Sequence, residues 1–170
     1  MPRLRQNRTH DLAPAAVRII SICVGVFFLA MGSNKLPWIG DPRLLEDRFI
    51  AWLPMAAPYA RWYLETIAIP GAAVFARLVP LAEITTACLL IAGIQVRAVA
   101  AAAMFMVLNF HFATSAFSSW AFLRDGTGLP VLGALLAIAL AGDAMPWSVR
   151  VARRGTEEVS GQEAPYFPAP

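Results

Sequence analysis

The sequence predicts an all-α integral membrane protein in which four helices form a bundle. Hydrophobic residues make up 58% of the 170 residues and charged residues only 15%, a balance that ordinary soluble domains do not have. Long apolar stretches follow one another along the chain, and a membrane-spanning helix needs about 20 such residues. Polar turns and arginines separate these stretches. The length allows a single domain.

The first apolar stretch covers residues 15–36 and follows a polar, basic segment over residues 1–14. Small and charged side chains recur in it at close to heptad spacing and share one face: Arg18, Ser21, Gly25, Gly32 and Lys35. We expect this face to pack against other helices, with Arg18 and Lys35 reaching towards the two membrane interfaces. A signal peptide cleaved near residues 30–32 is the alternative interpretation.

Residues 37–70 form a connection that is too polar to cross a bilayer. The connection contains several prolines, a charged stretch over residues 43–48 and a set of aromatic side chains: Trp52, Tyr59, Trp62 and Tyr63. Such aromatics favour the headgroup zone, so we expect an interfacial loop of short helices along the membrane surface. Either the aromatics anchor this loop, or they form the lid of a pocket in which Trp62 contacts a ligand.

The second span covers residues 71–93 and carries Glu83 near its middle. A carboxylate at that depth costs about 2.5–3.5 kcal/mol on insertion scales, so it normally faces protein or a water-filled pocket. At helical spacing it belongs to a small, partly polar stripe: Ala76, Val79 or Pro80, Glu83, Thr86 or Ala87, and Leu90. Such a stripe is typical of a helix face that packs against other helices. The bundle is therefore predicted to form around this face.

Two further spans complete the predicted membrane domain. A tight turn leads to the third span, residues 96–116, and a short polar turn leads to the fourth, residues 129–147. The membrane domain then covers residues 15–150. Residues 151–170 form a tail whose charged and proline-rich composition predicts disorder.

The distribution of arginines predicts the topology. Arginines precede the first span, separate spans two and three, and follow the last span: Arg3, Arg5, Arg8, Arg97, Arg150, Arg153 and Arg154. The positive-inside rule then places both termini in the cytoplasm and the connection over residues 37–70 outside. Topology also explains the net charge of +3, and because no dense basic patch occurs we expect no nucleic-acid partner.

Few residues in the chain suit known catalytic templates. The sequence has only two histidines, and Cys23 and Cys88 lie in separate apolar stretches, where we interpret them as packing residues. We therefore expect no metal site and no intrinsic cofactor. No glycine-rich phosphate loop occurs. The remaining polar candidates lie in or beside the spans: Lys35, Arg77, Glu83, Asn109 and His111.

Depth along straight helices limits which candidates meet. Lys35, at the outer end of span one, should lie about 14–16 Å above Glu83, so we expect no direct pair between them. Asn109 is closer in depth to Glu83, and His111 is about 200° further around the same helix. Only one of the two can face Glu83, and we predict Asn109, with His111 nearer the outer surface.

The same residues supply the candidates for a functional site. Glu83 and His111 are the candidates for catalysis, and Glu83, Asn109, His111 and Trp62 are the candidates for cofactor binding. Structural roles remain open for each: Glu83 as a buried packing group, and Asn109 and His111 as partners in interhelical hydrogen bonds. In an apolar bundle the charged form of Glu83 is penalised unless a cation or a water chain reaches it.

Three parts of the chain carry a family resemblance. They are the G-x-x-K motif at Gly32–Lys35, the span with Glu83 and the turn from Gly93 to Arg97, and the third-span sequence AAMFMVLNF. Together they resemble the DoxX family of small four-helix bacterial membrane proteins, over about residues 15–150. The resemblance implies an inner-membrane protein. Some relatives are described as the quinone-reducing subunit of a thiosulfate oxidoreductase, and others as membrane partners of oxidative-stress enzymes.

Three functions follow as hypotheses. The first is an accessory or anchoring subunit of a membrane-associated redox system, which acts with a redox-enzyme partner or as a homo-oligomer and is not an enzyme on its own. The second is a quinone-interacting oxidoreductase subunit, because Glu83 and His111 could supply protons near the quinone carbonyls. The third is a small proton- or ion-coupled transporter, which would have to oligomerise because four spans are few for alternating access.

Overall fold

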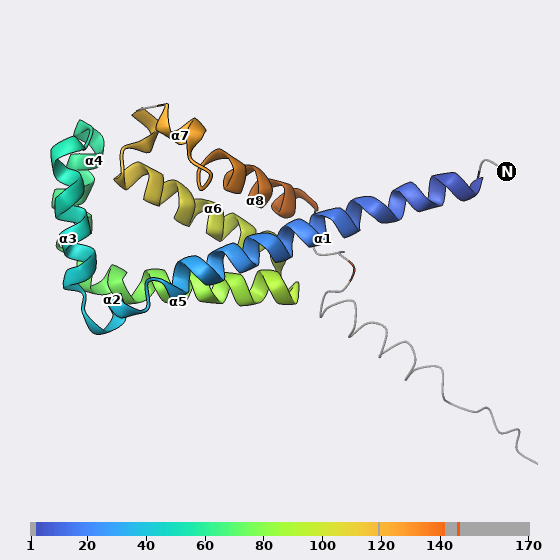
Figure 1. The fold of residues 1–170 in the computed structure, drawn as a ribbon, viewed down its shortest axis with the longest axis horizontal. Helices are drawn as coiled ribbons and strands as arrows, with labels where there is room; N and C mark the ends of the chain where they lie inside the picture. The colour runs from blue at the N-terminus through green and yellow to red at the C-terminus, as the bar shows by residue number, and fades with distance from the viewer. Residues whose placement is uncertain (1–2, 119, 142–145, 147–170) are drawn as a thin grey trace, which may run out of the picture.

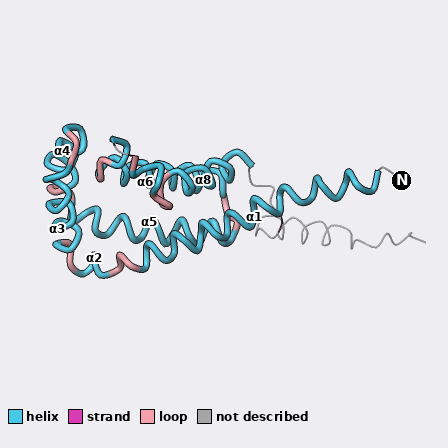
Figure 2. The backbone as a smooth tube through the Cα atoms, turned by 45° about the horizontal axis from the view of Figure 1, so that its top comes forward, coloured by secondary structure: helices cyan, strands magenta, loops and turns pink. Residues whose placement is uncertain are grey.

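The computed structural model describes residues 3–118, 120–141 and 146, and this part of the chain contains helices and turns but no strand (Figure 2). Three long helices dominate it: α1 (Arg3–Ser33), α5 (Ala72–Ala92) and α6 (Val96–Ala113). Each contains a stretch that is long and apolar enough to cross a membrane. The predicted all-α membrane bundle is thereby confirmed.

The predicted fourth span corresponds to a shorter helix in the described part of the chain. Helix α8 (Leu129–Ala141) has 13 residues and is strongly apolar. Residues 142–145 and 147, which would complete the span, lie outside the described residues, as does the predicted tail over 151–170. A fourth crossing of the membrane therefore stays a prediction.

The helices pack as two antiparallel pairs. Helix α1 runs along α5, and α6 runs along α8, which also contacts α1 (Figures 1 and 2). A 3-10 turn (Ala116–Ser118) and the short helix α7 (Ala121–Arg124) precede α8. The first turns of α1 project beyond the other helices. The predicted N-terminal segment and first span are thus one continuous helix from Arg3.

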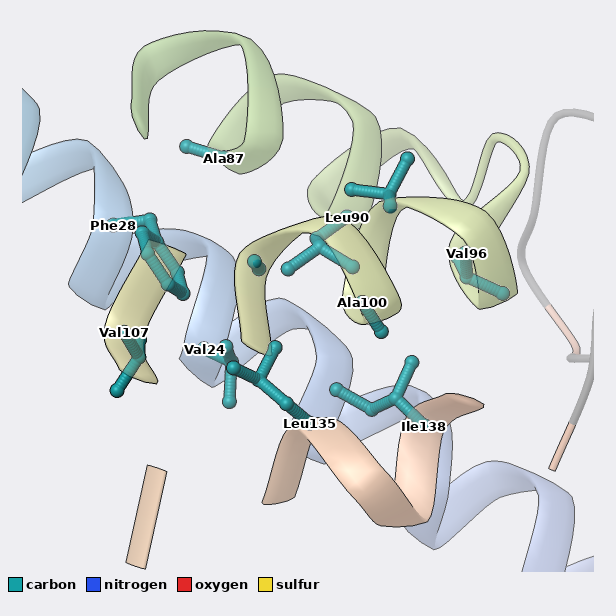
Figure 3. Packing of buried hydrophobic residues seen from close by; sticks show 11 residues of the cluster. Val24, Phe28, Ala87, Leu90, Val96, Ala100, Val107, Leu135 and Ile138 are labelled. Carbon is teal, nitrogen blue, oxygen red and sulfur yellow. The ribbon is translucent and has the colours of Figure 1, made fainter. Parts of the chain in front are cut away.

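Helices α1, α5, α6 and α8 all contribute to one hydrophobic core (Figure 3). Its buried side chains are mostly Val, Leu and Ala: Val24, Phe28, Ala87, Leu90, Val96, Val99, Ala100, Ala103, Val107, Leu135 and Ile138. Large apolar side chains on the opposite helix faces are exposed, as suits contact with lipid: Val26, Val74, Leu78, Leu81, Phe105 and Leu140. Cys23 and Cys88 are free and exposed, and so lie on this outer surface rather than in the core.

The small faces predicted for the first two spans meet where α1 crosses α5. A Cβ atom added to Gly25 would lie 2.7 Å from Ile91 Cγ1 and 3.1 Å from the Ala87 carbonyl oxygen. One added to Gly32 would lie 2.9 Å from Ile84 Cγ1. The absence of side chains at both positions therefore lets the two backbones approach closely, as small residues do in membrane helix pairs.

Arg18 caps the end of α5 from inside the bundle. Its guanidinium donates hydrogen bonds to the carbonyl oxygens of Leu90, at 2.7 Å, and Ile91, and the Ser21 hydroxyl donates to Leu90 at 3.0 Å. Carbonyls in the last turn of a helix have no partner within that helix, so these bonds satisfy them. Arg18 is only 2% exposed, so its guanidinium is enclosed by the helices at this end of α5.

The connection between the first two spans forms the expected short helices, which lie across one end of the bundle (Figure 1). These are α2 (Pro37–Gly40), α3 (Arg43–Trp52), a 3-10 turn (Leu53–Met55), α4 (Pro58–Tyr63) and a π-helical turn (Leu64–Ala68). They share a second core with the start of α5 and the end of α6: Trp38, Leu45, Phe49, Leu64, Ala68, Ala72, Ala76 and Ala113. The first turns of α5 therefore pack against α2 and α3.

Candidate functional site

A cavity of about 70 Å³ lies between α1, α5, α6 and the turn before α8. Aromatic and other apolar side chains form most of its lining: Phe27, Phe28, Met31, Met106, Val107 and Phe110. Four polar residues complete it: Lys35, Glu83, His111 and Thr127. An apolar lining with a few polar groups is characteristic of small-molecule sites. The cavity therefore gathers three of the sequence-predicted candidates in one place.

Lys35 and Glu83 form a buried ion pair in this cavity. The Lys35 ammonium donates a hydrogen bond to Glu83 Oε1, and each residue is only 6% exposed. The ammonium also lies 5.8 Å from the ring centre of Trp38 and 5.4 Å from that of Phe110. Such distances permit cation–π attraction. The prediction that Lys35 and Glu83 do not pair was wrong.

The error came from the assumed depth of Glu83. About 16 Å of α5 separate Ala72 from Glu83 at 1.5 Å per residue, and this part of the helix packs against α2 and α3 beyond the end of α1. A Cβ added to Gly32 would lie 3.1 Å from the Glu83 Cβ, so Glu83 is level with the last turn of α1. Lys35 follows that turn directly and reaches the carboxylate.

The second carboxylate oxygen of Glu83, Oε2, does not take part in the ion pair with Lys35. Glu83 Oε2 is buried and has no hydrogen-bond partner among the described residues. Asn109, the partner that the sequence suggested, does not bond to this oxygen. An unsatisfied buried oxygen is costly, so a water molecule or a ligand donor in the cavity would stabilise it.

His111 lies on the buried face of α6 and reaches the same cavity. Its Nδ1 is 2.8 Å from the Val107 carbonyl oxygen, which can only accept, so Nδ1 carries the hydrogen. Its Nε2 is buried and has no hydrogen-bond partner in the described part of the chain. The rings of Phe117 and Phe122 pack against the imidazole.

The choice of Asn109 over His111 was therefore wrong. The buried residues of α6 follow helical spacing through Ala100, Ala103, Val107 and His111. A stripe of small residues in the sequence marks this inward face, and extending it by one turn would have selected His111. The expectation that only one of the two residues faces Glu83 agrees with the structure.

Asn109 lies instead beside a second, smaller cavity at the end of the bundle. That cavity is lined by residues of α2, α3, α4, α5 and α6, among them Trp38, Trp52, Tyr63 and Asn109. Phe110 lines both cavities and separates them. Trp62, the other predicted ligand contact, is 59% exposed and lines neither of these two cavities. The aromatic connection is thus divided: Trp52 and Tyr63 line a cavity, and Trp62 points outwards.

Arg77, the remaining candidate, also lies away from the first cavity. It is exposed and donates a hydrogen bond to the Ala73 carbonyl oxygen, at 2.7 Å, within its own helix. Arg77 and Glu83 are six residues apart, so their side chains point to different sides of α5. Arg77 therefore has a local role on the outer face of that helix.

Asp125 lies on the turn before α8, where its Oδ2 is 3.6 Å from Nε2 of the cavity residue His111. Its carboxylate accepts hydrogen bonds from the Thr127 amide, at 2.9 Å, and the Thr127 hydroxyl, at 2.7 Å. These two bonds, with a smaller contribution from His111, hold the pKa of Asp125 below its usual range. The stabilisation of the turn is therefore present above the ordinary pKa of an aspartate and is lost only as the pH falls through the lowered value. No motif in the sequence singled out Asp125.

Together these features define a multi-pass helical membrane protein with a small, partly polar cavity near one end of its bundle. Among the described residues no group of three or more His, Cys, Asp or Glu side chains could hold a metal ion. The chain belongs to the DoxX family, whose model matches residues 16–116, a range that includes Lys35, Glu83 and His111. No curated protein and no solved structure matches the chain.

Proposed function

We propose that the cavity binds the head group of a quinone and that the protein is a membrane subunit of a redox system. The observation that carries this proposal is the convergence of Lys35, Glu83 and His111 in one aromatic-lined cavity. A quinone head group is a flat ring with two acceptor oxygens, which suits aromatic packing and a few well-placed donors. A protein that served only as an anchor would not need three buried polar side chains there.

The cavity residues fit such a ligand in their hydrogen-bonding capacity. Lys35 has three N–H groups, and one of them is given to Glu83 Oε1, so further donors can reach a quinone oxygen. His111 can donate from Nε2 when its ring is protonated. Glu83 holds the Lys35 ammonium in place and balances its charge. A bound quinone supplies two-electron redox chemistry, and a partner redox protein would provide the electrons.

The binding proposal can be tested with the purified protein in mild detergent. We expect a short-chain ubiquinone such as decylubiquinone to quench tryptophan fluorescence saturably, and we expect Glu83→Gln and the cavity-filling Met106→Trp to weaken its binding at least about tenfold. Because Met106→Trp adds a fluorophore, isothermal titration calorimetry is used to compare the affinities of all variants. Glu65→Gln is the matched control, because it makes the same chemical change at an exposed site in the π-helical turn.

Equal affinity of the Glu83→Gln and Glu65→Gln variants would contradict the site. Absence of saturable binding to the unaltered protein would contradict the quinone function and favour the anchoring role. In each variant, normal accumulation in the membrane separates a loss of binding from a loss of folding.

We further propose that the protein crosses the bacterial inner membrane four times, with both termini in the cytoplasm. The structure supports this topology because the turn that leads to Arg97 lies at the end of the bundle opposite to α2, α3 and α4 (Figure 1). Arg97 donates a hydrogen bond to the Ala139 carbonyl oxygen at 3.2 Å, which brings the C-terminal turn of α8 to this same end. Arg97 therefore lies at the same end of the bundle as the first turns of α1, which carry Arg3, Arg5 and Arg8, and this arrangement agrees with the positive-inside rule.

Reporter fusions will check this topology. We expect fusions after Leu45 and Asp125 to report an outward location, and fusions after Gln95 and Ser160 to report a cytoplasmic one. The reverse pattern at any one of these positions would contradict the four-span arrangement. A mature chain that begins near Ser33 would show that the first span is cleaved, and the helix that packs against α5 would then be lost.

A further inference from the structure

We propose that His111 and Asp125 form a proton-exchange pair that connects the cavity with the aqueous surface at the turn before α8. This inference rests on the proposed quinone function, because it assigns the route by which protons reach the ligand. It adds a residue, Asp125, that lies outside the matched family range.

The hydrogen-bonding of His111 determines which of its nitrogens exchanges protons. The Val107 carbonyl oxygen holds the hydrogen of Nδ1, so Nε2 has a free lone pair when the ring is neutral. Nε2 is buried and belongs to a residue that lines the cavity. A proton can therefore enter and leave at Nε2 while the bond to Val107 stays intact.

Asp125 lies where that proton would pass between the protein and solvent. Its Oδ2 is 3.6 Å from His111 Nε2, and its side chain is 46% exposed. Thr127 holds the carboxylate in this position and itself lines the cavity. A Cβ added to Gly128 would lie 3.3 Å from Nε2 and 2.7 Å from the Phe122 carbonyl oxygen, so the close approach of the turn depends on this glycine.

Three charged groups act on His111 from the elements around it. Asp125, on the turn before α8, favours the protonated ring, and so does Glu83, on α5, across the cavity. Lys35, which follows α1, opposes protonation, but its charge is balanced by Glu83. Asp125 is the group in direct ion-pair range. It is therefore the positioning residue for the imidazolium.

The proposed step transfers protons as follows. Protonated His111 gives the Nε2 proton to a quinone oxygen and then regains a proton from water beside Asp125. Two such transfers, with two electrons from the partner redox protein, convert one quinone into one quinol. Asp125 stays ionised throughout and stabilises each imidazolium before it transfers its proton.

Nitrogen NMR of a single-histidine protein tests the pair without any activity measurement. The chain has only two histidines, so His10→Gln leaves His111 alone. In detergent micelles we expect the neutral ring to carry its hydrogen on Nδ1 and to gain the second one at Nε2. We expect Asp125→Asn to shift the Nε2 resonance of His111 at a fixed pH, because the charge of the carboxylate 3.6 Å from Nε2 is removed.

Asp41→Asn is the matched control. Asp41 is also exposed, and its Oδ1 accepts a hydrogen bond from the amide two residues later, that of Arg43, at 3.1 Å. This variant should leave the Nε2 resonance of His111 unchanged. Equal Nε2 resonances in Asp125→Asn and Asp41→Asn, or a neutral ring with its hydrogen on Nε2, would overturn the proposal.

Addition of decylubiquinone to the same sample separates this inference from the proposed function. We expect the bound quinone to shift the Nε2 resonance. Binding that leaves Nε2 unchanged would overturn the proton route and retain the quinone function. Absence of binding, with an Nε2 resonance that still depends on Asp125, would overturn the quinone function and retain the paired residues.

Discussion

Replacing Lys35 with Met is expected to lower the free energy of unfolding by about 3–5 kcal/mol, because Glu83 would remain as a buried carboxylate without its partner. The cost arises from the charge that is left behind rather than from the strength of the ion pair itself. Denaturant unfolding in mild detergent, followed by the helical circular dichroism signal, measures the change. Membrane accumulation of the variant should fall in parallel.

A double substitution is the informative control for this experiment. Lys35→Met combined with Glu83→Met removes both charges and keeps similar volumes, so we expect it to recover most of the lost stability. Glu83→Met alone should be destabilising, because it leaves Lys35 buried among Trp38 and Phe110. A double variant no more stable than Lys35→Met would show that the pair is not the origin of the effect.

Replacing Gly32 with Leu is expected to destabilise the protein by about 3 kcal/mol or more, at the upper end of the effect of overpacking. The first atom of the new side chain would already lie 2.9 Å from Ile84 Cγ1 and 3.2 Å from the Ile84 amide nitrogen. Relief of this contact requires α1 to move away from α5. Because Gly32 is level with Glu83, that movement would also separate Glu83 from Lys35.

Gly133→Leu is the matched control for Gly32→Leu. A Cβ added to Gly133, in α8, would meet no atom within 4 Å. In a helix interior, leucine is more favourable than glycine by about 0.8 kcal/mol. This variant should be neutral or slightly more stable. Thermal unfolding in detergent compares the two, and an equal loss of stability in both would argue against a close approach of α1 and α5.

The helices and most of their inward faces could be predicted from local sequence patterns. Periodicity is a local property, so the small stripe around Glu83 and the heptad-spaced glycines of the first span could be recognised without knowing what they contact. The buried residues of α5 follow that stripe. Three of the five polar candidates, Lys35, Glu83 and His111, do line the first cavity. They could be selected from the sequence because a charged or titratable side chain within an apolar stretch is costly unless it is paired or lines a cavity.

Which of the candidate residues meet depends on how the helices pack against one another. The pairing of Lys35 with Glu83 depends on the axial position of α5 relative to α1, which is set by the packing of α2 and α3 on the first turns of α5. The placement of His111 rather than Asn109 at the cavity depends on the rotation of α6 against the whole core. Axial shift and rotation both arise from contacts between residues distant in the sequence, and no local pattern encodes them.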